Sequence, residues 1–347
     1  MKGCKIMINK LYDRFKQFIK YNLSFLIFLL LFLGAFSIKT DYSIYKAGGS
    51  INISQRINKA NDLDSSSGSF NMAYIGMIQG KLPFYLLAKI IPSWELIPND
   101  EITYNNKETI NDSLKRDHLY YEESISNAKL IAYKKSNIPY TIDKINNYII
   151  YIDEKCSADL KIGDEIISYD GINYTDLNTL KDYIKTKKIG NSISLVINRD
   201  NKKINEKAII FKEDDTLLIG VAAVTIYNIK SKNNIIIDPK TTESGPSGGL
   251  ILSLAIYDAL LDTNITKGNK VVGTGAIELD GTVTEIGGIK YKLAGAVKEN
   301  ADLFLVPTSN LKEALKYAKE KNYDIIIKGV SNFDEALEVL SNMEVKK

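Results

Sequence analysis

The longest uninterrupted apolar stretch of the chain lies near its N-terminus. Residues 21–38 carry no charged side chain, and a helix of that length would extend roughly 27 Å, enough to cross the hydrocarbon core of a bilayer. Residues 1–20 hold six lysine and arginine residues against the single acid Asp13. The positive-inside rule therefore predicts a cytoplasmic leader, a single-pass anchor in the plasma membrane and an extracellular remainder. A cleaved signal peptide is the alternative, because Ala35 and Ser37 resemble a small-residue cleavage site.

Short alternating patterns predict a small β-rich domain over residues 126–213. In chain order, the signals are a strand at 148–152, the pair Gly163-Asp164, a turn at Asp170-Gly171, a helix at 177–184 and a strand at 193–197. Residues 39–125 before this domain carry weaker patterns and are expected to form a membrane-proximal external region. Within that region, residues 81–91 predict a short helix that would either lie at a membrane surface or pack inside the external domain.

Residues 214–347 alternate apolar runs with helical spacings, which predicts a C-terminal α/β domain. Strands are expected at 221–229, 303–307 and 324–327, and helices at 250–261, from residue 290 onward, at 311–319 and after the capping residues Ser331 and Asp334. The whole chain is therefore expected to be an α+β multidomain protein with an N-terminal transmembrane helix.

The composition is that of a folded protein and argues against several functional classes. The 347 residues are 45% hydrophobic with a net charge of +3, so we expect no nucleic-acid partner. Cys4 and Cys156 would lie on opposite sides of the membrane, and we expect no disulfide. With His118 as the only histidine, and expected at the surface, neither a metal site nor a cofactor is predicted.

A glycine-rich motif places Ser247 as the candidate nucleophile. Gly245, Pro246 and Gly248 would form a tight turn ahead of the helix at 250–261. The serine would then stand at a helix N-terminus, where free N–H groups can stabilise an oxyanion. The same segment could instead be only a capped loop, since serine is a common N-cap residue.

A serine nucleophile needs a base, and the chain offers lysine more readily than histidine. His118 lies far upstream, whereas a buried lysine can lose its charge near neutral pH and accept a proton. Lys290 directly follows a Gly-Gly-Ile segment, 43 positions after Ser247, and Lys292 is its rival. The pattern therefore favours a Ser–Lys dyad.

The two motifs, together with the intervening run at 274–283, resemble the proteolytic domain of the Lon family of Ser–Lys peptidases. The resemblance implies that Ser247 is the nucleophile and that Lys290, in the position after Gly-Gly-Ile, is the general base. It also implies that the Thr274 hydroxyl orients the lysine amine.

Three positions depart from the family pattern. Ser244 stands where an acidic residue is frequent, Ala276 replaces a frequent glutamate, and Gly248 replaces the usual alanine. These departures leave the Ser–Lys pair in place but alter the acidic surroundings of the site.

The β-rich domain resembles a PDZ domain, which binds an extended peptide by adding a strand to a sheet edge. Residues 138–162 contain no glycine for a carboxylate-binding loop, so internal peptide binding or autoinhibition is as reasonable as capture of a free C-terminus. Anchor, PDZ-like domain and Lon-type domain together resemble the membrane-anchored PDZ–Lon peptidases of Gram-positive bacteria.

The resemblance implies a serine protease. We expect it to act without ATP, because the sequence contains no Gly-x-x-x-x-Gly-Lys-[Ser/Thr] phosphate loop. Its expected partners are unfolded, flexible or membrane-tethered protein segments, and its expected assembly is a homo-oligomeric ring. Two alternatives remain: a non-catalytic membrane scaffold, and an envelope esterase or amidase that uses the same dyad.

Overall fold

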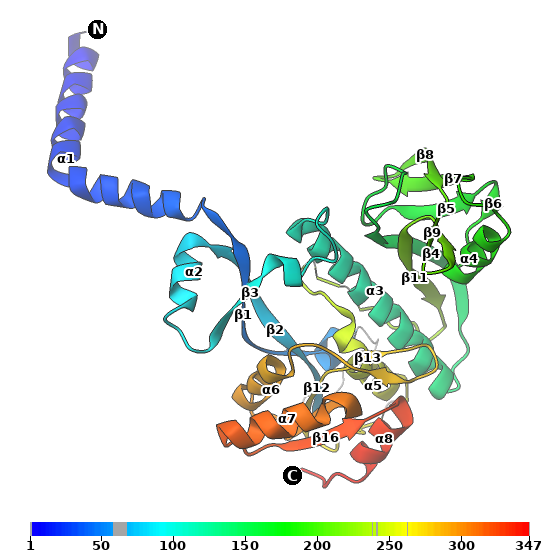
Figure 1. Ribbon diagram of the computed structural model, residues 1–347. Helices are drawn as coiled ribbons and strands as arrows, with labels where there is room; N and C mark the ends of the chain where they lie inside the picture. Colours follow the sequence, from blue (N-terminus) through cyan, green and yellow to red (C-terminus); the bar gives the residue numbers. More distant parts are fainter. Residues whose placement is uncertain (1, 58–67, 238, 241, 262, 347) are drawn as a thin grey trace. The chain divides into compact units, whose positions relative to one another are not determined.

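The computed structural model describes residues 2–57, 68–237, 239–240, 242–261 and 263–346 (Figure 1). The chain forms two compact units. The first comprises Met1–Lys46 and Met77–Asn99, and the second comprises Ala47–Gly76 and Asp100–Lys347. Strands β1 (Lys39–Asn52) and β2 (Ser69–Lys81) run through both units.

The first unit begins with the long helix α1 (Lys2–Ala35). Its segment Leu11–Ala35 has a mean hydropathy of 1.9 and is long and apolar enough to cross a membrane, a property that an N-terminal signal sequence shares. Helix α2 (Leu82–Ala88) follows β2, and β3 (Trp94–Pro98) then pairs antiparallel with β1 before the short helix η2 (Asn99–Glu101).

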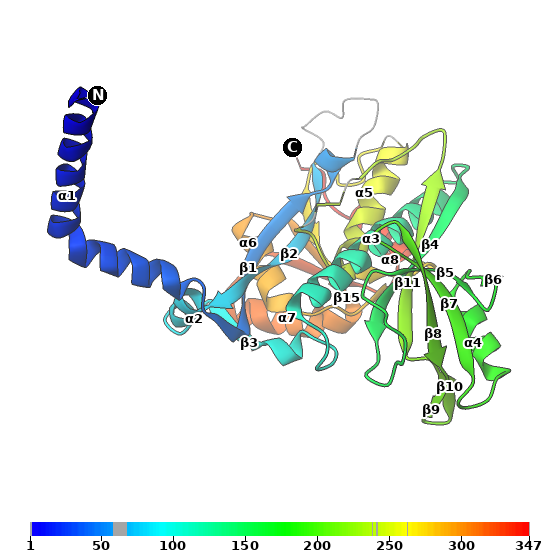
Figure 2. The same cartoon turned by 90° about the horizontal axis from the view of Figure 1, so that it is seen from above.

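The second unit contains a mostly parallel sheet in the order β16-β15-β12-β2-β1. The α/β part of this unit consists of that sheet and the elements around it, which are η1 (Ser54–Arg56), α3 (Ile110–Lys135), η3 (Pro246–Gly248), α5 (Gly249–Leu261), β12 (Lys270–Gly273), β13 (Ala276–Ile277), β14 (Val283–Thr284), α6 (Ile289–Lys298), β15 (Leu303–Pro307), α7 (Thr308–Lys321), β16 (Ile326–Val330) and α8 (Phe333–Ser341). Figure 2 shows the same elements from above.

Successive side chains of the central strands enter different cores, as the two-residue period of a strand requires. Val271, Leu303 and Leu305 pack with residues of α3, α5 and α8. Val272 and Phe304, one position along, pack with residues of α6 and α7. The predicted α/β domain is thus a sheet covered by helices on both faces.

Residues before the PDZ-like domain contribute to this sheet, which differs from the separate membrane-proximal region expected from the sequence. β2 runs parallel to β12, with Ser69 opposite Lys270 and Met72 opposite Gly273. Helix α3 packs against α5. Segments before and after the PDZ-like domain in the chain therefore build the α/β domain together.

The PDZ-like domain contains the predicted order of strand, turn, helix and strand. Its elements are β4 (Thr141–Ile152), β5 (Glu165–Tyr169), β6 (Ile172–Asn173), α4 (Leu177–Lys185), β7 (Ser192–Arg199) and β8 (Lys202–Ile209), followed by the hairpin β9 (Phe211–Glu213) and β10 (Thr216–Leu218). Asp170 and Gly171 have φ of 44° and 80°, as a two-residue hairpin turn with positive φ requires. The sheet order β11-β4-β5-β7-β8 includes β11 (Val221–Lys230), so this sheet extends past residue 213.

Candidate active site

Ser247 lies in η3, directly ahead of α5, so the serine stands at the start of a helix as the sequence predicts. Gly245 makes the preceding turn with a φ of 83°, a conformation that glycine adopts at little cost. Pro246 is the first residue of η3, and Ser247 itself is half-buried. The Gly249 N–H bonds to the Pro246 carbonyl and the Leu250 N–H to the Gly275 carbonyl at 3.0 Å, so the first two N–H groups of α5 are already engaged.

The backbone of Ser247 is held by the turn that follows β12. Its carbonyl oxygen accepts hydrogen bonds from the Gly275 N–H at 2.7 Å and the Thr274 Oγ1 at 3.1 Å. Thr274 is fully buried. Ser247 is therefore fixed relative to the carboxyl end of a central strand of the sheet.

Lys292 on α6 contacts the same threonine. Its Nζ donates to Thr274 Oγ1 at 3.2 Å, and only 4% of the residue is exposed. Burial lowers the pKa of Lys292 from 10.5 to about 7, because a low-dielectric environment disfavours the ammonium form. The Thr274 hydroxyl thus joins an amine that can be neutral near pH 7 to the backbone of Ser247.

Lys290, the base implied by the motif resemblance, lies elsewhere on α6. It is half-buried, and its Nζ lies 5.0 Å from the centroid of the Tyr291 ring. Residues two apart on a helix point in directions that differ by about 200°, so Lys290 and Lys292 cannot share one face. Lys292 has the helical spacing of the buried residues Ile289 and Ala296, and this periodicity is the sequence signal that identifies it.

Helix α3 holds the loop that leads to Ser247. The Asp117 carbonyl accepts from the Gly245 N–H at 2.6 Å, and Ser124 Oγ donates to the Pro246 carbonyl at 3.0 Å. His118 Nδ1 lies 3.1 Å from the carbonyl oxygen of Glu243. His118 is thus half-buried against this loop, whereas the sequence analysis expected a surface residue.

Glu243 is a buried acid four positions before Ser247 that the sequence analysis did not identify. Its carboxylate forms an ion pair with Arg56, which follows β1 in the chain, and accepts from the Lys240 N–H at 3.2 Å. Only 6% of Glu243 is exposed, whereas Ser244 is exposed. The acidic residue of this loop therefore stands one position earlier than the family pattern suggests.

Glu123 on α3 is a further carboxyl group with a perturbed pKa. Burial raises the pKa of Glu123 to about 7, the Thr225 backbone opposes that rise, and the Glu278 carboxylate adds to it. Glu123 adjoins Ser124, which bonds the loop. A pH dependence of the site could come from Lys292 or from Glu123, and an experiment must distinguish these two groups.

A side chain of β2 explains why residue 248 is a glycine, where the family usually has alanine. A Cβ at this position would lie 2.1 Å from the Sδ of Met72, which is itself buried. Met72 thus fills the space that an alanine methyl group would need.

Gly248→Ala is therefore expected to lower the free energy of unfolding by about 1–3 kcal/mol, as overpacking of a core does. Gly287→Ala is the matched control, because a Cβ there meets no atom within 4 Å. Urea denaturation of both variants measures the difference. Equal stabilities would show that Met72 moves aside without cost.

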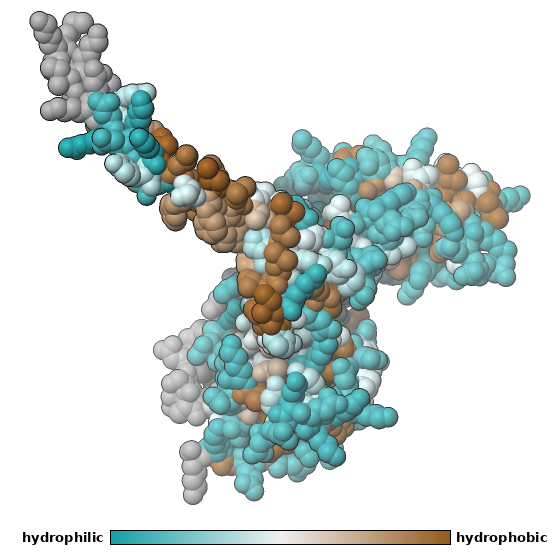
Figure 3. Space-filling model, turned by 60° about the vertical axis from the view of Figure 1, so that its left-hand side comes forward, coloured by the Kyte–Doolittle hydropathy of each residue, from teal (hydrophilic) through white to brown (hydrophobic). Residues whose placement is uncertain are grey.

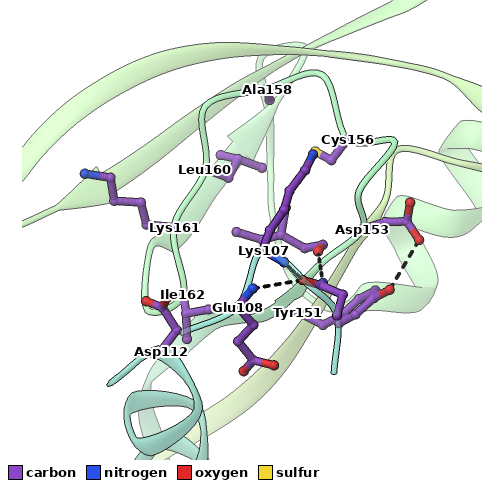
Figure 4. Close-up of a pocket in the computed structure, with 12 residues that line it drawn as sticks. Lys107, Glu108, Asp112, Tyr151, Asp153, Cys156, Ala158, Leu160, Lys161 and Ile162 are labelled. Carbon is purple, nitrogen blue, oxygen red and sulfur yellow. Dashed lines mark hydrogen bonds between the residues drawn. The ribbon is translucent and has the colours of Figure 1, made fainter. Parts of the chain in front are cut away.

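A separate cavity of about 240 Å³ lies between the chain ahead of α3 and the end of β4 (Figure 4). Asn105 Nδ2 donates to the Ile152 carbonyl at 2.8 Å beside it, and the Cys156 thiol lines it. Burial raises the pKa of Cys156, which keeps the thiol protonated and unreactive. None of the residues that line this cavity belongs to the Ser247 site. Within the described part of the chain, no group of three or more His, Cys, Asp or Glu residues could hold a metal ion.

The C-terminal part of the chain is similar to known proteins. The family model of the Lon protease (S16) C-terminal proteolytic domain matches residues 230–342. A Lon protease of Campylobacter jejuni is 32% identical over 126 residues, which cover 31% of this chain and 16% of the relative. A mitochondrial Lon protease homolog of Phaeodactylum tricornutum is 24% identical over 197 residues, covering 52% of this chain and 22% of the relative.

Among solved structures, the PDZ domain of an SdrC-like protein from Listeria monocytogenes is 23% identical, with a TM-score of 0.21. The match covers 24% of this chain and 90% of that domain. The chain spans less than a quarter of the length of the two Lon relatives described above. Residues 230–342 therefore match the model of the Lon protease (S16) C-terminal proteolytic domain, and two Lon proteases are similar to part of the chain.

Proposed function

We propose that this chain is a membrane-anchored serine endopeptidase in which Ser247 is the nucleophile and Lys292 is the general base. One observation carries the proposal: the buried Lys292 amine donates to the Thr274 hydroxyl, which in turn donates to the Ser247 backbone. Lys292 takes the role that the motif resemblance gives to Lys290, since burial prepares Lys292 to be neutral at physiological pH.

In the proposed reaction, neutral Lys292 accepts the hydroxyl proton as Ser247 Oγ attacks the carbonyl carbon of a peptide bond. Backbone N–H groups near Ser247 stabilise the oxyanion that forms. The Lys292 ammonium then protonates the departing amine, and the acyl-enzyme remains. Water, deprotonated by Lys292, hydrolyses the ester and restores Ser247.

Thr274 is a positioning residue in this scheme. Its hydroxyl accepts from Lys292 Nζ and donates to the Ser247 carbonyl, which uses both hydrogen-bonding capacities of a threonine side chain. Gly245, Pro246 and Gly248 shape the turn that presents Ser247.

Membrane anchoring by α1 and peptide recognition by the PDZ-like domain complete the proposal. The segment Leu11–Ala35 supports an anchor through its length and hydropathy, and the basic leader supports a cytoplasmic N-terminus. The substrates would be unfolded, flexible or membrane-tethered segments that are cleaved without ATP outside the cytoplasm. The PDZ-like domain would bind such segments or regulate the site.

A non-catalytic scaffold is disfavoured by the cost of burying Lys292. An amine that burial holds at a pKa of about 7 destabilises the fold at neutral pH. A domain that serves only assembly does not need a neutral buried amine, whereas a Ser–Lys peptidase needs one as its general base.

The test uses the full chain in lipid vesicles with a reduced, alkylated protein as substrate and no ATP. We expect the wild type to produce peptides that mass spectrometry detects, and Ser247→Ala to produce none. Cleavage that persists in Ser247→Ala would overturn the assignment of the nucleophile. Hydrolysis of a small ester without any peptide cleavage would instead indicate the esterase alternative.

A further inference from the structure

The short helix α2 exposes apolar side chains that its own unit does not cover. Leu86 and Leu87 are 52% and 43% exposed, and Ile90, just after the helix, is 76% exposed. Ile90 is four positions from Leu86 and three from Leu87, so it lies beside both on the surface of the helical turn. Ala88, on another face, is the buried residue of α2.

Helix α2 is fixed close to the end of α1. The N–H groups of Phe36, Ser37 and Ile38 bond to carbonyls three residues earlier, so the chain stays compact beyond Ala35. The Leu82 N–H then donates to the Ile38 carbonyl at 2.9 Å. Since three residues span at most about 10 Å, α2 begins near the point where α1 ends.

Aromatic side chains connect the two helices. The ring of Phe36 lies 5.1 Å from that of Phe32 and 5.6 Å from that of Phe84, measured between centroids. Phe32 in turn lies 6.0 Å from Phe28, inside the apolar segment of α1. Hydrophobic side chains thus continue from α1 to α2. Figure 3 shows them along the second half of α1 and on the face that comes forward in that view.

The unit that carries this apolar face also contains paired lysine and aromatic side chains. Lys89 Nζ lies 4.5 Å from the ring centroid of Tyr85, and Lys46 Nζ lies 5.3 Å from that of Trp94. Side chains with an apolar body and a polar tip are favoured at the boundary between lipid headgroups and acyl chains. Lysines there attract anionic lipid headgroups.

We propose that α2 inserts its apolar face into the outer lipid–water interface as a second membrane attachment. The inference rests on the proposed anchoring of the chain by α1. The lipid surface is the occupant that the geometry favours, because α2 is bonded to the chain at the end of the proposed span. Leu86, Leu87 and Ile90 would lie among the upper acyl chains, roughly 5–10 Å into the boundary.

Such an attachment would restrict the rotation of the first unit about α1. A single helix leaves the residues that follow it free to rotate, whereas a second contact a few residues later fixes one face of the unit against the bilayer. Strands β1 and β2 would then leave the membrane in a defined direction.

The experiment uses the full chain in vesicles of phosphatidylethanolamine and phosphatidylglycerol, with Cys4→Ser and Cys156→Ser as background. A single cysteine is introduced as Leu86→Cys, Leu33→Cys or Leu315→Cys and labelled with an environment-sensitive fluorophore. Leu33 reports on α1. Leu315 on α7 is the matched control, because its exposure of 49% equals that of Leu86 within a few per cent.

Acyl chains brominated near the headgroup then serve as quenchers. We expect the label at position 86 to lose most of its emission, as the label at position 33 does, while the label at position 315 keeps its emission. Quenching at 33 without quenching at 86 would overturn the inference and leave the anchor intact. A blue-shifted but unquenched label at 86 would show a protein partner instead of lipid and would also overturn it. The absence of quenching at 33 would overturn the anchor itself, and the inference with it.

Discussion

Lys292→Met is expected to lower the rate of peptide cleavage by about 10²–10⁴-fold, the range that a general base contributes. Methionine resembles lysine in length and suits a buried site, so the variant should fold. It lacks the amine that donates to Thr274 and that is neutral near pH 7. Single-turnover cleavage of a fluorogenic peptide measures the loss. The Michaelis constant is expected to change little, because the amine acts on the reacting hydroxyl.

Lys290→Met is the matched control on the same helix. Its Nζ lies over the Tyr291 ring, and the residue is half-buried, so cleavage should stay close to the wild-type rate. The opposite result, with activity lost at 290 and kept at 292, would restore the base that the motif resemblance implied and would contradict the mechanism proposed above.

The difference between the two lysines shows what a motif can and cannot predict. A position counted from Gly-Gly-Ile selects Lys290, whereas the direction of a side chain depends on the helix that begins at Ile289. The helical period places Lys292 with Ile289 and Ala296 on the side that packs into the core. Spacing therefore selects Ser247 and Lys290 as candidates, and the period of the helix adds Lys292 as the buried lysine.

Local patterns predicted the helices and strands better than they predicted which strands pair with one another. The strand–turn–helix order of the PDZ-like domain follows from short-range signals such as Asp170-Gly171. The parallel pairing of β2 with β12 joins residues about 200 positions apart, and no periodicity within either strand encodes such a partner. The same reason explains why β11 pairs with β4 although it was expected in the C-terminal domain.

The rate of cleavage should rise with pH through the pKa of Lys292, about 7, and level off above it. Below that pKa the amine is protonated and cannot accept the Ser247 proton, so the rate should fall about tenfold per pH unit. Glu123 also has a pKa of about 7 and is the rival titrating group. Glu123→Gln should keep the same profile. A profile that becomes flat in this variant would assign the titration to the carboxyl group instead.

The same pKa predicts that Lys292→Met stabilises the fold at neutral and acidic pH. Burial lowers the pKa of Lys292 from 10.5 to about 7 in the folded protein, so the unfolded chain binds more protons between these values. The free energy of unfolding of the wild type should therefore fall as the pH decreases from 10.5 to 7. Below pH 7 the contribution of Lys292 should stay constant. The methionine variant lacks this loss, and its free energy of unfolding should exceed that of the wild type by on the order of 5 kcal/mol at pH 6, a difference that shrinks toward pH 10. Urea unfolding of both proteins at pH 6, 8 and 10 measures the trend. An advantage that is independent of pH would mean that the amine is already solvated or paired in the folded state, and such an amine would not serve as a neutral base.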